Sequence, residues 1–224
     1  MRGLTHRSGI APVIALMAIS GCGGTIAANV PSRPAGTLAA RAPVMMFVGD
    51  SFTVGSGPVP EWETYASQAA RRLGWQPVIA GAGGTGFVNE GRVGRTFRES
   101  FEVELAWRPP PDLLVISGGH NDRRWSAERV RHAAEGLLDR VRGHWPDTRI
   151  VVVGPIWLDD APRKAYEVRD AVARAAVRAG VAFLDPMDRR WVTGKRSAVV
   201  LPDGVHPTRA GHEHLAAWLA PKLA

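Results

Sequence analysis

The sequence has few of the residues that would define several common classes of protein. Cys22 is the only cysteine among 224 residues, so no disulfide can form within one chain. Lysine occurs only at positions 164, 195 and 222, and most of the formal net charge of +7 therefore comes from scattered arginines. No basic block or aromatic-interleaved stripe is present. This charge indicates solvated helix faces, and we expect no nucleic-acid partner.

The N-terminal region also lacks an apolar run long enough to span a bilayer. The run from Ile10 to Ile19 follows Arg2 and Arg7 and is too short for a membrane helix, which is typical of a secretory signal peptide. The segment that ends in Gly21 and Cys22 then resembles the bacterial lipobox, in which a peptidase cuts before a cysteine that receives lipid. We therefore expect a signal peptide over residues 1–21 and a lipoprotein at the extracytoplasmic face of a bacterial cell membrane. With an ordinary cleavage site instead, the protein would be secreted.

Bulky apolar residues are nearly absent from the next segment as well. Residues 22–43 are mostly glycine, alanine, proline, serine and threonine, a composition that cannot bury enough surface to fold. We interpret the part after Cys22 as a flexible tether. The remaining residues, 44–224, are enough for one sizeable core, and we expect a single domain there.

In that domain, short apolar runs alternate with longer amphipathic stretches. The predicted strands are Val44 to Val48, Pro77 to Ala80, Leu113 to Ser117, Ile150 to Val153 and Val181 to Leu184. The predicted helices are Trp62 to Leu73, Ala127 to Val141, Arg163 to Ala179 and His212 to Leu223. Continuous apolar runs are typical of strands covered on both faces, so we predict an α/β fold of three layers with a doubly wound, mostly parallel sheet of five strands. Ligands bind at the carboxyl ends of such strands.

Polar side chains that could take part in catalysis follow two of those strands. Ser51 follows the first strand within Gly49 to Gly55, where a serine is exposed to a cleft together with its backbone N–H. Taken alone, Asp50 and Ser51 would equally serve as a helix cap. Asn121 follows the third strand after two glycines, where its amide can donate to an oxyanion or bond its own backbone in a turn.

A third motif precedes the final helix. Asp203 and His206 are three residues apart across Gly204, so the chain can fold back and let the carboxylate fix the tautomer of the imidazole. Pro207 suits the first position of the following helix, because its missing N–H would be unbonded there in any case. This placement predicts that His206 lies at the edge of a loop.

Together these motifs resemble the SGNH hydrolases, also called GDSL-type esterases. The resemblance runs through Gly49-Asp50-Ser51, Gly119-His120-Asn121-Asp122 and Asp203-Gly204-Val205-His206-Pro207, and covers the chain from Val44 to its end. It implies the flavodoxin-like strand order and a catalytic domain over residues 44–224. The family's remaining glycine falls within Gly81 to Gly86, where Gly84 matches best and Gly83 stays open. Phe52 stands where the GDSL consensus has leucine, at a position expected to pack.

The resemblance also implies the roles of the site residues. Ser51 would be the nucleophile, His206 the general base and then general acid, and Asp203 the group that orients His206. The oxyanion would be held by the N–H groups of Ser51 and Gly84 and by the Asn121 amide. The implied activity is hydrolysis of a small-molecule, glycan or lipid ester, without a metal or other cofactor. Transfer of the acyl group to an alcohol, or a non-catalytic ligand-binding lipoprotein, are the alternatives.

Three weaker patterns compete with this interpretation. Gly81 to Gly86 satisfies a dinucleotide-binding fingerprint, with Glu102 about twenty residues further on, but Gly91 and Gly94 interrupt the helix that the fingerprint needs. His212 and His214 are spaced two apart, which on a helix points them in different directions, so we interpret them as surface residues. Five tryptophans could line a groove, but we expect each to be half-buried in the core: Trp62, Trp107, Trp125, Trp157 and Trp191.

Overall fold

The computed structural model describes residues 41–224. The predicted signal peptide, the lipidation site Cys22 and nearly all of the predicted tether lie outside the described residues. Within the described part of the chain, no helix is both long enough and apolar enough to cross a membrane.

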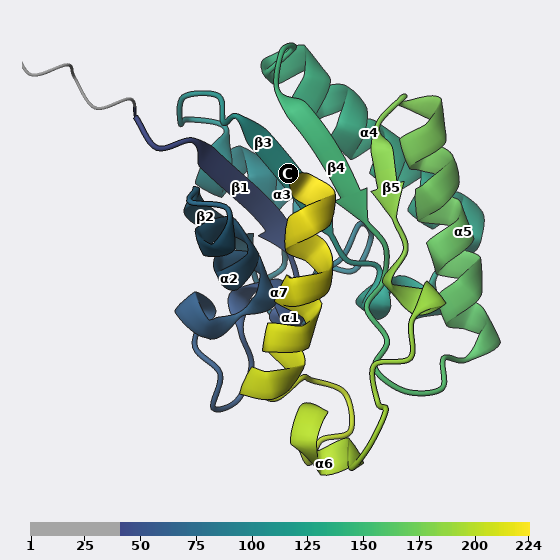
Figure 1. The fold of residues 1–224 in the computed structure, drawn as a ribbon. Coiled ribbons are helices and arrows are strands. Elements are labelled where there is room, and N and C mark those ends of the chain that lie inside the picture. Colours follow the sequence, from purple (N-terminus) through teal and green to yellow (C-terminus); the bar gives the residue numbers. More distant parts are fainter. Residues whose placement is uncertain (1–40) are drawn as a thin grey trace, which may run out of the picture. The chain divides into compact units, whose positions relative to one another are not determined.

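Five strands form a single sheet in which every neighbouring pair is parallel. The strands are β1 (Val44–Gly49), β2 (Gln76–Gly81), β3 (Leu113–Ser117), β4 (Arg149–Val153) and β5 (Ala182–Leu184). Their order across the sheet is β2-β1-β3-β4-β5 (Figure 1). The predicted five-stranded doubly wound fold is confirmed, and the sheet is parallel throughout the described residues rather than mostly parallel.

Helices cover both faces of this sheet. The helices α2 (Tyr65–Arg72) and α7 (Arg209–Leu223) pack together on one face, and α4 (Ala127–His144) and α5 (Arg163–Arg178) pack together on the other (Figure 1). Shorter helical segments connect them: α1 (Ser51–Val54), η1 (Glu61–Glu63), α3 (Phe97–Ser100), η2 (Phe101–Leu105), η3 (His120–Arg124), η4 (Pro186–Asp188) and α6 (Arg196–Val199).

Strand β1 shows why the apolar runs are continuous. Met45 and Phe47 are buried in the core beneath α2 and α7, while Met46 and Val48 are buried in the core beneath α4 and α5. Successive side chains of a strand point to opposite faces, so a strand in a two-sided sheet needs apolar residues at every position. The two cores hold β1 rigidly at the centre of the sheet.

Two helix starts differ from the sequence-based expectation. The predicted helix from Trp62 is divided, because the Thr64 side chain accepts the Ser67 N–H and α2 begins only after it. The final helix begins at Arg209, between Pro207, which suited a first helical position, and His212, where the predicted stretch began, because Thr208 is its N-cap and accepts the Gly211 N–H at 3.2 Å. Pro207 instead forms an isolated bridge with Val200.

Glycines let the chain turn sharply at the carboxyl ends of β1 and β2. A Cβ on Gly49 would lie 2.1 Å from Thr53 Oγ1. Gly81 has φ +122°, and a Cβ there would lie 1.9 Å from the Gly49 carbonyl oxygen. Only glycine fits such contacts. The loops after β1 and β2 therefore begin side by side, at the carboxyl edge of the sheet. There the connections after β1 and β3 leave toward opposite faces, and ligands of doubly wound folds bind.

Candidate active site

Ser51 lies directly after β1, as the first residue of the short helix α1. Asp50 is the N-cap of this helix, and its Oδ1 accepts the Phe52 N–H at 3.0 Å. The expected local role as a helix cap is therefore correct for Asp50. With Asp50 as the cap, the Ser51 hydroxyl faces the carboxyl edge of the sheet. The backbone N–H of Ser51 is among the unpaired donors of the helix start.

The structure brings His206 and Asp203 to Ser51. His206 Nε2 lies 2.8 Å from Ser51 Oγ, and His206 Nδ1 lies 2.7 Å from Asp203 Oδ2. Although partial burial raises the pKa of Asp203, bonds from the Val205 N–H, the His206 ring and the His206 N–H outweigh it and hold this pKa at about 2. Asp203 is thus a carboxylate at neutral pH. It fixes the His206 proton on Nδ1 and leaves Nε2 free to accept from Ser51.

A closed turn holds these two residues together. The Leu201 N–H donates to the His206 carbonyl at 2.8 Å, and the Gly204 N–H donates back to the Leu201 carbonyl at 3.0 Å. Arg196 joins this turn to a neighbouring loop, since Nη2 donates to the Gly204 carbonyl at 3.0 Å and Nε lies 2.7 Å from Asp159 Oδ2. Nothing in the sequence motifs pointed to Arg196, because its partners come from separate segments.

Asn121 follows β3 on the segment η3 and directs its side chain to the loops after β1 and β2. Its Nδ2 donates to the Thr85 carbonyl at 2.9 Å and to Asp50 Oδ2 at 3.4 Å. The turn alternative, in which the amide bonds its own backbone, is therefore wrong. The amide is fixed instead between the two loops that flank Ser51.

Gly84 lies in the loop after β2 with φ +81°, a conformation that favours glycine. Asn89 Nδ2 donates to the Gly84 carbonyl at 2.6 Å and holds this part of the loop. Gly83 stands next to it, and a Cβ on Gly83 would lie 3.7 Å from the Ser51 Cβ. Both glycines line the cavity that contains Ser51.

Asp122 organises the rest of this loop from below. It is completely buried, and its two carboxylate oxygens accept the N–H groups of Phe87, Val88 and Asn89, each at 2.9 Å. A Cβ on Gly86 would lie 2.4 Å from Asp122 Oδ2, so the loop passes directly over the carboxylate. The sequence motif contained Asp122 but assigned it no role. The available signal in the sequence was an acidic residue directly after Asn121.

Asp50 is the second buried carboxyl group beneath the site. It is only 2% exposed, and this burial, with a smaller contribution from the nearby Asp122, raises its pKa to about 7 against the opposing bond from Phe52 N–H. Its Oδ2 is the weaker of the two acceptors of Asn121. The orientation of the amide therefore depends mainly on the shorter bond to the Thr85 carbonyl.

His120 forms one wall of the site. Its ring stacks on Trp157 at 4.1 Å between ring centroids and contacts Phe52, whose ring also packs against His206. Burial lowers the pKa of His120 to about 4, so the ring is neutral at neutral pH. Phe52, the departure from the GDSL consensus, is 2% exposed and packs against both imidazoles, as expected for this position.

A cavity of about 710 Å³ opens above these residues. Its lining includes every predicted site residue except Asp203, which lies behind His206: Ser51, Gly83, Gly84, Asn121 and His206. The remaining lining residues are Ser56, Asn89, Gly91, Arg92, His120, Arg123 and Val205. This volume is within the range of small-molecule sites.

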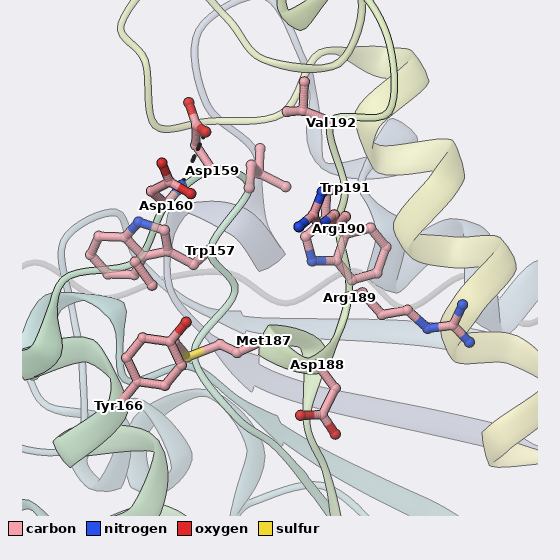
Figure 2. A pocket seen from close by; sticks show the side chains of 12 residues that line it. Trp157, Asp159, Asp160, Tyr166, Met187, Asp188, Arg189, Arg190, Trp191 and Val192 are labelled. Atoms are coloured by element: carbon pink, nitrogen blue, oxygen red, sulfur yellow. Dashed lines mark hydrogen bonds between the residues drawn. The ribbon is translucent and has the colours of Figure 1, made fainter.

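A second cavity, of about 730 Å³, lies on the other side of Trp157 (Figure 2). Trp157 and Tyr166 lie on one side of it, and Arg190 and Trp191 on the other (Figure 2). It contains none of the predicted site residues. The Trp157 ring separates it from the Ser51 cavity, because that ring stacks on His120.

The tryptophans differ in their surroundings. Trp62 and Trp107 are 66% and 69% exposed, so the expectation of a half-buried core position is wrong for both. Trp62 lies on the short segment η1, and Trp107 lies just after η2 with the Arg108 guanidinium 4.3 Å from its ring centroid. Trp125 is partly buried against one core, as expected, whereas Trp191 is in the other core as expected but almost fully buried rather than half-buried.

The structure also shows where the two competing sequence patterns lie, the glycine run from Gly81 to Gly86 and the pair His212 and His214. After Gly81 the chain forms turns, and the next helix opens only at Phe97, so no helix N-terminus meets the glycine run. His212 is 1% exposed, and its Nδ1 accepts the Tyr65 N–H at 3.1 Å, so its interpretation as a surface residue is wrong. The chain packs α7 against α2 through this histidine. His214 is exposed and faces away from it.

The arrangement has the parts needed for acyl transfer. A serine is bonded to an imidazole, the imidazole to a carboxylate, and fixed N–H donors lie beside the serine. On a doubly wound sheet, this combination is typical of hydrolases that use a serine.

Comparison with known proteins agrees with this class. The profile of the GDSL-like lipase/acylhydrolase family matches residues 47–214, so the chain belongs to this family. GDSL lipase Rv0518 of Mycobacterium tuberculosis is 30% identical over 198 residues, and the match covers 84% of this chain and 84% of that one. The protein is therefore a carboxylic ester hydrolase, and the alternative of a non-catalytic lipoprotein is set aside.

Solved structures share the fold. The lipase/acylhydrolase from Enterococcus faecalis has a TM-score of 0.64 and 17% identity, and the match covers 81% of this chain and 95% of that one. Est24, a carbohydrate acetylesterase from Sinorhizobium meliloti, has a TM-score of 0.63 and 20% identity, with 81% and 98% covered. At these identities the likeness establishes a common architecture.

Proposed function

We propose that the protein hydrolyses carboxylic esters through an acyl-enzyme on Ser51. The observation that carries this proposal is the continuous line of hydrogen bonds from Asp203 through His206 to Ser51, with distances of 2.7 and 2.8 Å. A serine hydroxyl at its ordinary pKa is a poor nucleophile and needs an adjacent base. His206 Nε2 is in reach of that proton, and Asp203 stabilises the imidazolium that forms.

The reaction then has two halves. Ser51 Oγ bonds to the ester carbonyl carbon while its proton passes to His206 Nε2, and the carbonyl oxygen becomes an oxyanion. His206 gives the proton to the alcohol oxygen as the carbon–oxygen bond breaks and the alcohol leaves. Water then attacks the acyl-enzyme, again with His206 as base, and releases the acid and free Ser51.

We assign the oxyanion hole to the N–H groups of Ser51 and Gly84 and to Asn121 Nδ2. Donors aimed at the developing charge stabilise the transition state. Asn121 already donates to the Thr85 carbonyl at 2.9 Å, so the longer 3.4 Å bond to Asp50 is the one exchanged for the oxyanion. The first bond holds the amide in place during this exchange.

We further propose that the substrates are cell-envelope or extracellular esters, such as acetylated glycans or lipids. The signal-like N-terminus and Cys22 support a lipoprotein at an extracytoplasmic membrane face. The relatives named lipase and carbohydrate acetylesterase are consistent with both ester classes. Location disfavours cytosolic acyl-CoA.

The activity is tested with the full chain and its Ser51→Ala variant on 4-nitrophenyl acetate, butyrate and octanoate. We expect turnover by the wild type alone, and a mass increase on Ser51 after treatment with a fluorophosphonate. A folded wild type that hydrolyses none of the three would contradict the proposal, and so would label at another residue. Product analysis with added alcohol separates hydrolysis from acyl transfer, because transfer yields a new ester.

The location is tested in a bacterial host by detergent-phase partition of the wild type and Cys22→Ala. We expect only the wild type to enter the detergent phase, and the mass of its N-terminal peptide to begin at lipid-modified Cys22. Equal partition of the two forms would contradict the lipid anchor.

A further inference from the structure

We propose that the Ser51 cavity selects esters whose alcohol part carries a negative charge, and that Arg123 is the residue that recognises it. This inference rests on the proposed function and names the substrate class for the same site. The charge is a carboxylate, phosphate or sulfate, since guanidinium binds each of these through paired N–H donors.

The charged residues of the cavity carry this inference. Arg92 and Arg123 both line the cavity that contains Ser51, and no aspartate or glutamate of residues 41–224 is among its lining residues. Neither arginine forms an ion pair with a carboxylate in the described part of the chain, unlike Arg196, which pairs with Asp159. Two unneutralised cations in a concave site produce a positive potential that attracts an anion.

Arg123 is held in place with most of its donors free. Its Nη1 donates to the His120 carbonyl at 3.1 Å, and its guanidinium lies 5.9 Å from the centroid of the Trp157 ring. A guanidinium has five N–H donors, so one bond to the protein leaves the others for a ligand. The bond to the His120 carbonyl and the contact with the Trp157 ring orient this partly exposed side chain in the absence of a substrate.

The position of Arg123 indicates which part of the ester it contacts. His206 must protonate the departing alcohol oxygen, so the alcohol lies against the wall that contains His206. His120 belongs to that wall, because the Phe52 ring packs against the rings of both His120 and His206, with centroid distances of 5.4 and 5.5 Å. Arg123 is bonded to His120 and therefore faces the alcohol part.

Arg92 lies on the opposite wall, next to the oxyanion loop. It follows Gly91, whose Cα would lie 3.5 Å from a Cβ on Gly84. From there Arg92 adds to the positive potential of the entrance. We assign to Arg92 the long-range attraction of the anionic substrate. Arg123 makes the direct contact with the negative charge.

The experiment uses two acetate esters that differ only in charge on the alcohol, 4-acetoxybenzoate and 4-acetoxybenzamide, with the full chain and acetate release as readout. The measured quantity is the ratio of kcat/KM for the anionic ester to that for the neutral one. We expect Arg123→Gln to lower this ratio about 10-fold, the size of one charge-assisted hydrogen bond. Arg123→Lys should restore part of it, and Arg92→Gln should lower it by a smaller factor.

Arg124→Gln is the matched control, since Arg124 is the exposed neighbour of Arg123 and does not line the cavity. It should leave the ratio unchanged. Raising the ionic strength from about 0.05 to about 0.5 M should lower the wild-type ratio towards that of Arg123→Gln, because salt screens exposed charges.

Equal losses on both esters in Arg123→Gln would overturn the proposal, because they indicate a structural role. So would a larger effect on 4-nitrophenyl hemisuccinate, whose charge is on the acyl part. Absence of activity on every ester, 4-nitrophenyl acetate included, would instead contradict the proposed function itself.

Discussion

His206 Nε2 lies 2.8 Å from Ser51 Oγ, although 155 residues separate them in the chain. Two separate parts of the fold hold these residues in contact. Burial of β1 in both cores fixes Ser51, and the turn closed by Leu201 and Gly204 fixes His206. The two residues therefore meet before any substrate arrives, which removes the need to order them during the reaction.

The first prediction concerns the dependence of these two residues on each other. Ser51→Ala and His206→Ala should each lower kcat about 10⁴-fold or more, and the double variant should be no slower than the slower single variant. The reason is that the imidazole acts only through the hydroxyl. Steady-state kinetics on 4-nitrophenyl acetate measures this. Multiplied losses in the double variant would show that His206 has a separate role.

The second prediction concerns Asn121. Asn121→Ala should lower kcat by about 10²- to 10³-fold with little change in KM, because an oxyanion donor acts mainly in the transition state. The variant also loses the bond to the Thr85 carbonyl, so its thermal unfolding must be measured beside the kinetics. Unchanged kcat in a folded variant would remove Asn121 from the oxyanion hole.

The sequence predicted the sheet well because the signal was local and strong. In β3 every residue from Leu113 to Ser117 is buried, and such a run has few alternatives to a central strand. The ends of the strands could be predicted because a glycine stands at or directly after the end of four of them. The two sequence signals for the start of α7, Pro207 and the apolar stretch from His212, both missed it, because the Thr208 side-chain cap determines where the helix begins.

The site was predicted only where its residues fell within short motifs. Asp203 and His206 are three residues apart, so their contact could be anticipated. Arg123 and Trp157 could not be placed from the sequence, because their positions relative to Ser51 depend on how η3 and the loop after β4 meet across the sheet edge. Burial of His212 was likewise missed, since its partner Tyr65 is 147 residues away.

The third prediction tests the buried carboxylate beneath the oxyanion loop. Asp122→Asn should lower the free energy of unfolding by about 2–4 kcal/mol, because one amide oxygen replaces two carboxylate oxygens and the new NH₂ faces backbone donors. The loop with Gly84 should shift, so kcat should fall as well. Urea denaturation measures the first effect. Asp188→Asn, at an exposed position, is the control, and an equal change in both variants would contradict this role.

The fourth prediction concerns stability at acid pH. Burial lowers the pKa of His212 from 6.5 to about 4, so the unfolded chain binds a proton on this residue at a higher pH than the folded chain does. Where the unfolded state binds more protons, stability falls with falling pH, and this window runs from about pH 6.5 to about pH 4. The loss due to His212 should reach about 3 kcal/mol.

His212→Asn isolates this effect. The asparagine Oδ1 takes the place of Nδ1 and can still accept the Tyr65 N–H, but it does not titrate. His120 has a similarly lowered pKa and contributes in the same direction, whereas the raised pKa of Asp50 contributes stability that is lost as pH rises towards 7. Both are present in wild type and variant, so they cancel in the difference. Denaturant unfolding at a series of pH values should give a shallower acid loss for the variant, and parallel curves would mean that His212 is protonated equally in both states.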